Sequence, residues 1–174
     1  MNRAVFSLAL LLVALPAAAQ QTPPCAKGQS VREIDPQTHV VIQKTRLEPR
    51  PASFDPLLVW TSDEPDSVML VVMGNGVTEK YPKCFGLTVL ADGQALKLGE
   101  PRHEAETGGS HTVEYVTSDI AWSEAEKLAA AKAISYKICN DEFQADPAFV
   151  CQAHDLLAAA TAWRQEQAGK KPTP

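Results

Sequence analysis

This 174-residue sequence lacks the common patterns that assign a reaction or a cofactor. It has no Cys-x-x-Cys pair, and no two of its four histidines stand at ligand spacing, which argues against a zinc site. There is no Gly-x-Ser-x-Gly elbow for a nucleophile, and the acidic turn at residues 63–66 lacks the ligand pattern of an EF-hand. We therefore predict no catalytic, cofactor-binding or metal-binding residue.

Positive charge is also scarce. Sixteen Lys and Arg against 21 Asp and Glu give a formal net charge of −5. An acidic balance disfavours nucleic acid and anionic lipid surfaces as partners. No segment after residue 19 has the run of about 20 apolar residues that a membrane-spanning helix needs. We predict no nucleic-acid partner and no membrane insertion after signal cleavage.

The one long apolar run opens the chain and has the features of an export signal. Arg3 supplies a positive charge, residues 4–15 form a twelve-residue apolar stretch, and three alanines at 17–19 fit a signal peptidase. The stretch is too short to span a bilayer, and residues 21–24 before Cys25 do not match a lipoprotein signal. We predict cleavage after the third alanine, and a periplasmic protein, or an extracellular one if the cell has a single membrane.

Four cysteines remain after this cleavage, namely Cys25, Cys84, Cys139 and Cys151. An even number in an exported chain predicts two disulfides, with free buried thiols as the alternative. Of the three possible connectivities, the spacing favours Cys25–Cys84 with Cys139–Cys151. Periodicity places Cys139 on the polar face of its strand and Cys151 away from the apolar stripe of its helix. The second bridge is therefore expected to be a clasp at the surface.

The middle of the sequence alternates short β-branched runs with turn residues. Strands are predicted at residues 38–45, 57–62, 67–73 and 77–81, with a turn at 74–76. The run 67–73 is apolar on both faces, so it should lie in the middle of the fold. Two hairpins follow, 85–90 with 94–98 across Asp92-Gly93, and 102–106 with 111–117 across Gly108-Gly109.

The second hairpin carries the main polar constellation. A two-residue loop at Gly108-Gly109 would place Glu106 opposite His111 and His103 opposite Glu114. A carboxylate beside a histidine can orient a general base. However, the pleat puts the two pairs on opposite faces, so they cannot form one site, and ordinary cross-strand charge pairing is the simpler interpretation.

Two helices are predicted in the last third of the chain. Ser123 and Glu126 form a capping box for the first, and the strand at residues 134–138 follows it. Asp146 caps the second helix, and Pro147 takes its first position. Its apolar stripe consists of Phe149, Ala153, Leu156, Ala160 and Trp163.

From residue 112 to residue 143 the predicted order is strand, capped helix with Leu128-Ala129-x-Ala131-Lys132, strand, turn and strand. Together with the Asp92-Gly93 hairpin, this arrangement resembles small exported bacterial domains of unknown function. The resemblance covers the C-terminal half of the chain. It implies a β-rich domain with flanking helices, and it implies no activity because no catalytic residues belong to the pattern.

These patterns predict a single disulfide-stapled α+β domain, either a curved antiparallel sheet or an incomplete β-sandwich, with two helices packed on one side. The expected division is a signal peptide at 1–19, an extended leader at 20–30, the domain at 31–168 and a disordered tail at 169–174. The function expected is that of a non-catalytic exported protein that binds another protein or an envelope component. An inhibitor or immunity factor against an envelope-directed enzyme is the alternative, and a hydrolase is a third.

Overall fold

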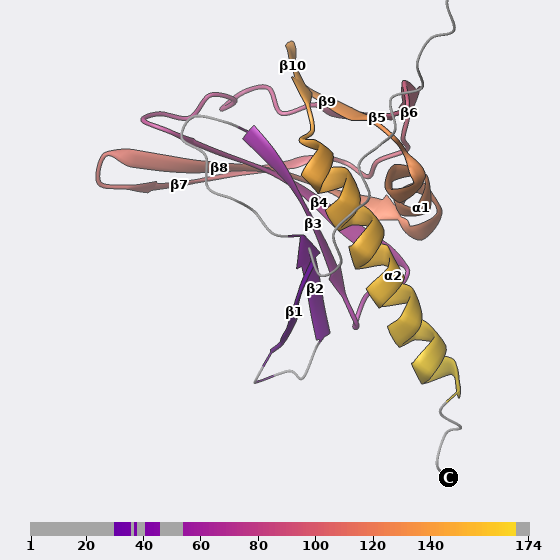
Figure 1. Cartoon of the computed structure of the whole chain (residues 1–174). Helices are drawn as coiled ribbons and strands as arrows, with labels where there is room; N and C mark the ends of the chain where they lie inside the picture. The colour runs from indigo at the N-terminus through magenta and orange to yellow at the C-terminus, as the bar shows by residue number, and fades with distance from the viewer. Residues whose placement is uncertain (1–29, 36, 38–40, 46–53, 170–174) are drawn as a thin grey trace, which may run out of the picture.

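The computed structural model describes residues 30–35, 37, 41–45 and 54–169 (Figure 1). The predicted signal, the leader up to residue 29, most of the predicted tail and Cys25 lie outside these residues. The described chain forms ten strands and two helices, and the predicted α+β class is confirmed. In chain order these are β1 (Ser30–Ile34), β2 (Val41–Thr45), β3 (Phe54–Thr61), β4 (Ser67–Gly76), β5 (Leu87–Ala91), β6 (Gln94–Ala95), β7 (Arg102–Gly108), β8 (His111–Ala121), α1 (Trp122–Ala130), β9 (Ile134–Ile138), β10 (Asp141–Gln144) and α2 (Pro147–Gly169).

The strands form two antiparallel sheets. The larger has the order β1-β2-β3-β4-β8-β7, and the smaller has the order β10-β9-β5-β6. In Figure 1 the smaller sheet lies at the top, α1 lies at one side, and α2 runs across the larger sheet. Successive side chains of a strand point to opposite faces, so the larger sheet has two distinct faces.

One face of the larger sheet, the inner face, builds the hydrophobic core. It contributes Leu58, Trp60 and Val72, which form one buried cluster with residues of the smaller sheet and of both helices. The rings of Trp60 and Trp163 contact edge to face at 5.3 Å between centroids, which places α2 on this face. The predicted stripe of α2 is confirmed, because its first four members are buried in the core and Trp163 packs against it.

The predicted turn at residues 74–76 is wrong, because β4 continues through these residues and pairs with β8 as far as Gly76–Thr112. Gly74 serves close packing instead. A Cβ on Gly74 would lie 2.4 Å from two ring carbons of Phe54, so only glycine leaves room for that ring.

The predicted strand at residues 77–81 is also wrong. The backbone N–H groups of Lys80 and Tyr81 donate to the carboxylate of Glu114 instead of to a neighbouring strand. We call residues 77–86, which join β4 to β5, the strap. A side chain from β8 therefore fixes this segment in an irregular conformation.

The two hairpins differ in how well their turn residues predicted them. Asp92 and Gly93 have φ angles of 49° and 80°, as the predicted type I′ turn requires. In the second hairpin the loop is formed by Gly109-Ser110, and Gly108 pairs with His111. The predicted register is therefore wrong by two residues, a shift that leaves every side chain on its predicted face.

The helices start differently. The predicted capping box at Ser123 is wrong, because α1 begins at Trp122 directly after β8, with Ala121 at the N-cap and no side-chain cap. The carboxylate of Glu126 instead accepts a 2.8 Å hydrogen bond from the Trp122 indole N–H. The predicted start of α2 is confirmed, because Asp146 Oδ1 accepts from the backbone N–H of Ala148 at 2.8 Å.

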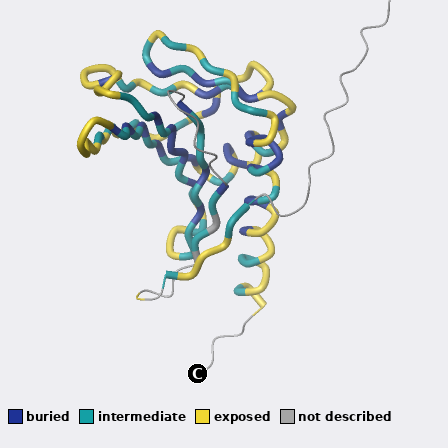
Figure 2. Tube along the Cα trace, turned by 60° about the vertical axis from the view of Figure 1, so that its left-hand side comes forward, coloured by how far each residue is buried: buried dark blue, intermediate teal, exposed yellow. Residues whose placement is uncertain are grey.

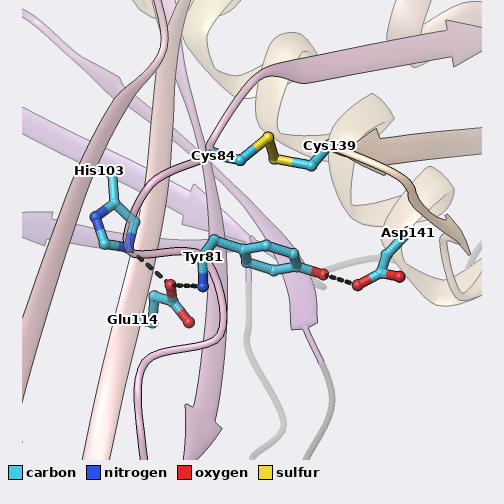
Figure 3. The surroundings of a disulfide bond; sticks show 6 residues. All are labelled: Tyr81, Cys84, His103, Glu114, Cys139 and Asp141. Atoms are coloured by element: carbon cyan, nitrogen blue, oxygen red, sulfur yellow. Dashed lines mark hydrogen bonds and ion pairs between the residues drawn. A yellow bond between two sulfur atoms is a disulfide. The ribbon is translucent and has the colours of Figure 1, made fainter.

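The predicted disulfide pairing is wrong, because Cys84 is bonded to Cys139 (Figure 3). β5 and β9 pair with Leu87 opposite Ile138, which brings the end of the strap beside the β9–β10 turn. Cys139 has a φ of 56° in that turn, so strand alternation does not predict its direction. Cys151 is buried on α2 and belongs to another disulfide, so the predicted surface clasp does not exist.

Candidate functional site

The structure brings together one of the two polar pairs predicted from the second hairpin. His103 Nε2 lies 2.7 Å from Oε1 of Glu114 (Figure 3). His103 stands directly opposite Val116, so the contact with Glu114 runs diagonally between β7 and β8. Both side chains point to the inner face, and the Glu114 side chain is only 3 % exposed.

The buried carboxylate of Glu114 holds the strap. Its Oε2 accepts from the backbone N–H of Lys80 at 2.9 Å, and its Oε1 accepts from that of Tyr81 at 2.7 Å. The imidazole of His103 is stacked on Phe85 at 5.6 Å between centroids. Because Glu114 already binds three groups of the protein, the His103–Glu114 pair acts as a structural anchor between β7, β8 and the strap.

A second polar cluster joins the strap to β10. The Tyr81 hydroxyl donates to Asp141 Oδ2 at 2.7 Å, and Lys80 Nζ lies 2.9 Å from the same oxygen. The hydrogen bond from Lys80, followed by that from Tyr81, lowers the pKa of Asp141. Burial and the bond to Asp141 raise the pKa of Tyr81 to about 12. Asp141 is charged and Tyr81 protonated at neutral pH, and the two shifts widen the pH range over which their hydrogen bond persists.

Aromatic rings surround the ammonium group of Lys80. Its Nζ lies 5.2 Å from the ring centroid of Tyr81 and 5.6 Å from those of Phe54 and Phe143. Phe143 is in turn stacked on Tyr136, whose hydroxyl donates to the backbone carbonyl of Phe54. The chain's own lysine thus supplies the cation for this group of rings.

A cavity of about 410 Å³ opens beside these two clusters. It is lined by Phe54, Gly74, Asn75, Gly76, Thr78, Glu79, Lys80, Glu114 and Phe143. Lys80 is paired with Asp141 and Glu114 binds the strap, so both of these ionisable groups already have partners. Among the described lining residues there is no serine, cysteine or histidine, and the hydrogen bonds of Glu114 and the ion pair of Lys80 hold the strap.

The other predicted pair is not formed. Glu106 lies opposite Val113 and His111 lies opposite Gly108, so the two side chains share the other face of the hairpin but are not directly opposite each other. Among the described residues, no group of three or more His, Cys, Asp or Glu side chains is placed to hold a metal ion.

The larger sheet carries a second apolar surface on the side away from the core, which we call the outer face. It consists of seven side chains from three neighbouring strands, namely Leu57, Val59, Met69, Val71, Met73, Val113 and Tyr115. Six of them are partly exposed, and Val71 at the centre is 7 % exposed. None of the seven belongs to the core cluster formed by the described residues.

Polar residues border the outer face along neighbouring strands. Pairing places Lys44 beside Val59, Asp119 beside Met69, and Glu104 beside Tyr115. Figure 2 shows buried and partly exposed positions mixed along the central strands, and along β8 the two alternate from Thr112 to Ile120. The result is an apolar centre with a charged border.

The run at residues 67–73 is apolar on both faces and predicts an interior strand, but it does not by itself identify the outer face as a site. β4 is an interior strand, as expected, with Val68, Leu70 and Val72 in the core. Identifying the outer face requires knowing that β3 and β8 flank β4, so that their outward residues extend the surface of Met69 and Met73. The available signal in the sequence was the apolar residues at alternate positions of β3 and β8, such as Leu57 with Val59 and Val113 with Tyr115.

No protein-family model, curated protein or solved structure matches this chain. In the described part of the chain, no helix has both the length and the apolar character needed to cross a membrane.

Proposed function

We propose that this is an exported, non-catalytic protein that binds another protein or an envelope component through the outer face. This proposal rests on the seven-residue apolar surface, which is separate from the core and bordered by charged residues. Contiguous apolar surface with a polar border is typical of interaction sites on folded proteins.

Two features support export to a periplasmic or extracellular location. The first 19 residues have the charge, apolar stretch and small residues of a cleavable signal. The described part of the chain contains the Cys84–Cys139 disulfide, a bond that persists in oxidising compartments. The resemblance to exported bacterial domains of unknown function agrees with this proposal.

The hydrolase hypothesis receives less support. Of the three charged groups in the cavity wall, Lys80 and Glu114 are held by groups of the protein itself, and Glu79 is exposed. The inhibitor or immunity hypothesis is a special case of the proposed function in which the bound partner is an enzyme.

Site-specific photo-crosslinking in the producing cell tests the proposal. The photoreactive residue p-benzoylphenylalanine replaces Tyr115 on the outer face in the full chain, and a matched control carries it at exposed Ala162 on α2. We expect a partner that crosslinks from position 115 and not from position 162.

A substitution in the same surface supplies the binding test with the purified partner. Met73→Glu places a charge in the apolar centre and should abolish binding without a large change in melting temperature, because Met73 lies outside the core cluster. Ala162→Glu is the control and should bind like the wild type. Equal crosslinking from both positions, or unchanged binding by Met73→Glu, would contradict the proposal.

A further inference from the structure

We infer that the partner of the outer face is a basic protein, whose Lys and Arg side chains pair with Glu104 and Glu106 beside the apolar contact. This inference rests on the proposed function and adds the chemistry of the partner. Glu104 and Glu106 lie on the edge strand β7, opposite Tyr115 and Val113 respectively. Directly opposite residues have Cβ atoms about 5 Å apart, so each carboxylate borders the apolar centre.

The positively charged side chains at the border of the outer face already form ion pairs with carboxylates of the same chain. Arg102 donates to both carboxylate oxygens of Asp119, at 2.9 and 3.3 Å, and these bonds raise its pKa. Lys44 Nζ lies 2.7 Å from Glu33. In the described part of the chain, Glu104 and Glu106 make no ion pair and both are exposed, although the charge of Glu104 contributes to the raised pKa of Arg102. Arg102 is shared between Asp119 and Glu104, so the β7 side of the outer face presents an excess of negative charge.

This charge distribution favours some binding partners of the outer face over others. A second copy of the chain would bring the same carboxylates and a net charge of −5, and an anionic lipid surface would also be repelled. A basic protein gains from the acidic border, which speeds its association and fixes its orientation. An apolar centre on the partner would then cover Val113, Tyr115 and their neighbours.

The test uses the partner captured from position 115, purified, with the dissociation constant measured by calorimetry at low and high NaCl. The variant is Glu104→Gln/Glu106→Gln, and the control is Glu142→Lys on β10 of the smaller sheet, which changes net charge by the same two units. We expect the double variant to weaken binding at least about tenfold and to lose most of the salt dependence, and the control to bind within about twofold of the wild type.

The outcomes separate the inference from the proposed function. Wild-type binding that does not respond to salt, or equal effects of the double variant and the control, would overturn the basic partner and leave the outer face as a docking surface. Capture of a second copy, or of another part of the same chain, from position 115 would also overturn it. Absence of any crosslink specific to position 115 would overturn the proposed function itself.

Discussion

At the scale of single residues, Gly74 shows how a missing side chain shapes the fold. It lies in β4 with the ring of Phe54 where a Cβ would be, and Phe54 is itself buried in the core. We expect Gly74→Ala to lower the free energy of unfolding by about 1–3 kcal/mol, because the ring must move within a packed core. Urea denaturation measures the change.

Gly86→Ala is the matched control for Gly74→Ala, since a Cβ there meets nothing within 4 Å. Its expected effect is about 1 kcal/mol or less, and a small gain would be consistent with reduced freedom of the unfolded chain. If both substitutions had the same effect, the contact between Gly74 and Phe54 would not be the reason for glycine.

Tyr81 gives a prediction on alkaline pH. Burial, followed by the hydrogen bond to Asp141, raises its pKa from 10 to about 12. Because the folded-state pKa lies above the unfolded one, this contribution to stability is complete below pH 10 and is lost as the pH rises through about 12. Absorbance at 295 nm should show a tyrosinate transition near pH 12 that is absent from Tyr81→Phe.

The same variant allows a check on stability. The wild type should lose stability more steeply than Tyr81→Phe between pH 10 and 12. Lys80, whose pKa is raised by its hydrogen bond to Asp141, adds to the slope of both proteins. Ionisation of Tyr81 near pH 10 in the folded protein would show that its hydroxyl is not buried against Asp141.

At the scale of elements, the Cys84–Cys139 bond ties the strap to the β9–β10 turn. Its sequence separation of 55 residues predicts, by the loop-entropy argument, a contribution of about 4 kcal/mol to the free energy of unfolding. Non-reducing peptide mapping should return a peptide pair containing Cys84 and Cys139, with Cys151 in a separate bridge. Cys84→Ser/Cys139→Ser should have a lower urea midpoint.

The strap is stabilised by more than the disulfide, because Glu114 and Asp141 accept hydrogen bonds from Tyr81 whether or not the disulfide is formed. The double cysteine variant should therefore still fold. A peptide joining Cys139 to Cys151 would show that the surface clasp predicted from sequence is correct and that the pairing of β5 with β9 needs revision.

Elements with local signals were predicted well. Asp92-Gly93 alone determines a type I′ turn, Asp146-Pro147 starts α2, and the alternation of residues 134–138 gives β9 its buried face. In each case the required information lies within a few neighbouring residues, so tertiary contacts do not need to be known.

Elements whose conformation depends on distant partners were not predicted. Residues 77–81 have strand propensity, yet the Glu114 carboxylate, 33 residues from Tyr81, takes the hydrogen bonds that a strand would need. Residues 108–110 offered several glycine-containing loops, and their local sequence did not distinguish between two registers. The cysteine pairing failed for the same reason, because it depends on β5 lying beside β9.

At the scale of the whole molecule, the larger sheet separates two apolar regions with different roles. Alternation shows which residues of a strand share a face, but residues 67–73 are apolar on both faces, so alternation alone does not identify the inner face as the core. The His103–Glu114 contact was predicted as a pair, although its role as an anchor for the strap required the backbone of Lys80 and Tyr81. The outer face emerges only when β3, β4 and β8 are placed side by side.

The two methionines that follow Met1 in the sequence, Met69 and Met73, both lie on the outer face. Methionine adapts to irregular partner surfaces, and its oxidation to the sulfoxide follows exposure. We expect hydrogen peroxide to oxidise both in the native protein with little change in circular dichroism, because neither contributes to the core cluster of the described residues. Peptide mass spectrometry measures the oxidation, and the oxidised protein should lose its partner.

Met69→Leu/Met73→Leu is the control for that experiment, since leucine keeps the apolar surface but resists peroxide. It should bind the partner before and after treatment, which separates loss of docking from general damage. The bound partner should also protect both methionines of the wild type. If Met69 and Met73 oxidised only after urea had unfolded the chain, the outer face would be covered in the native molecule, and docking through it would be wrong.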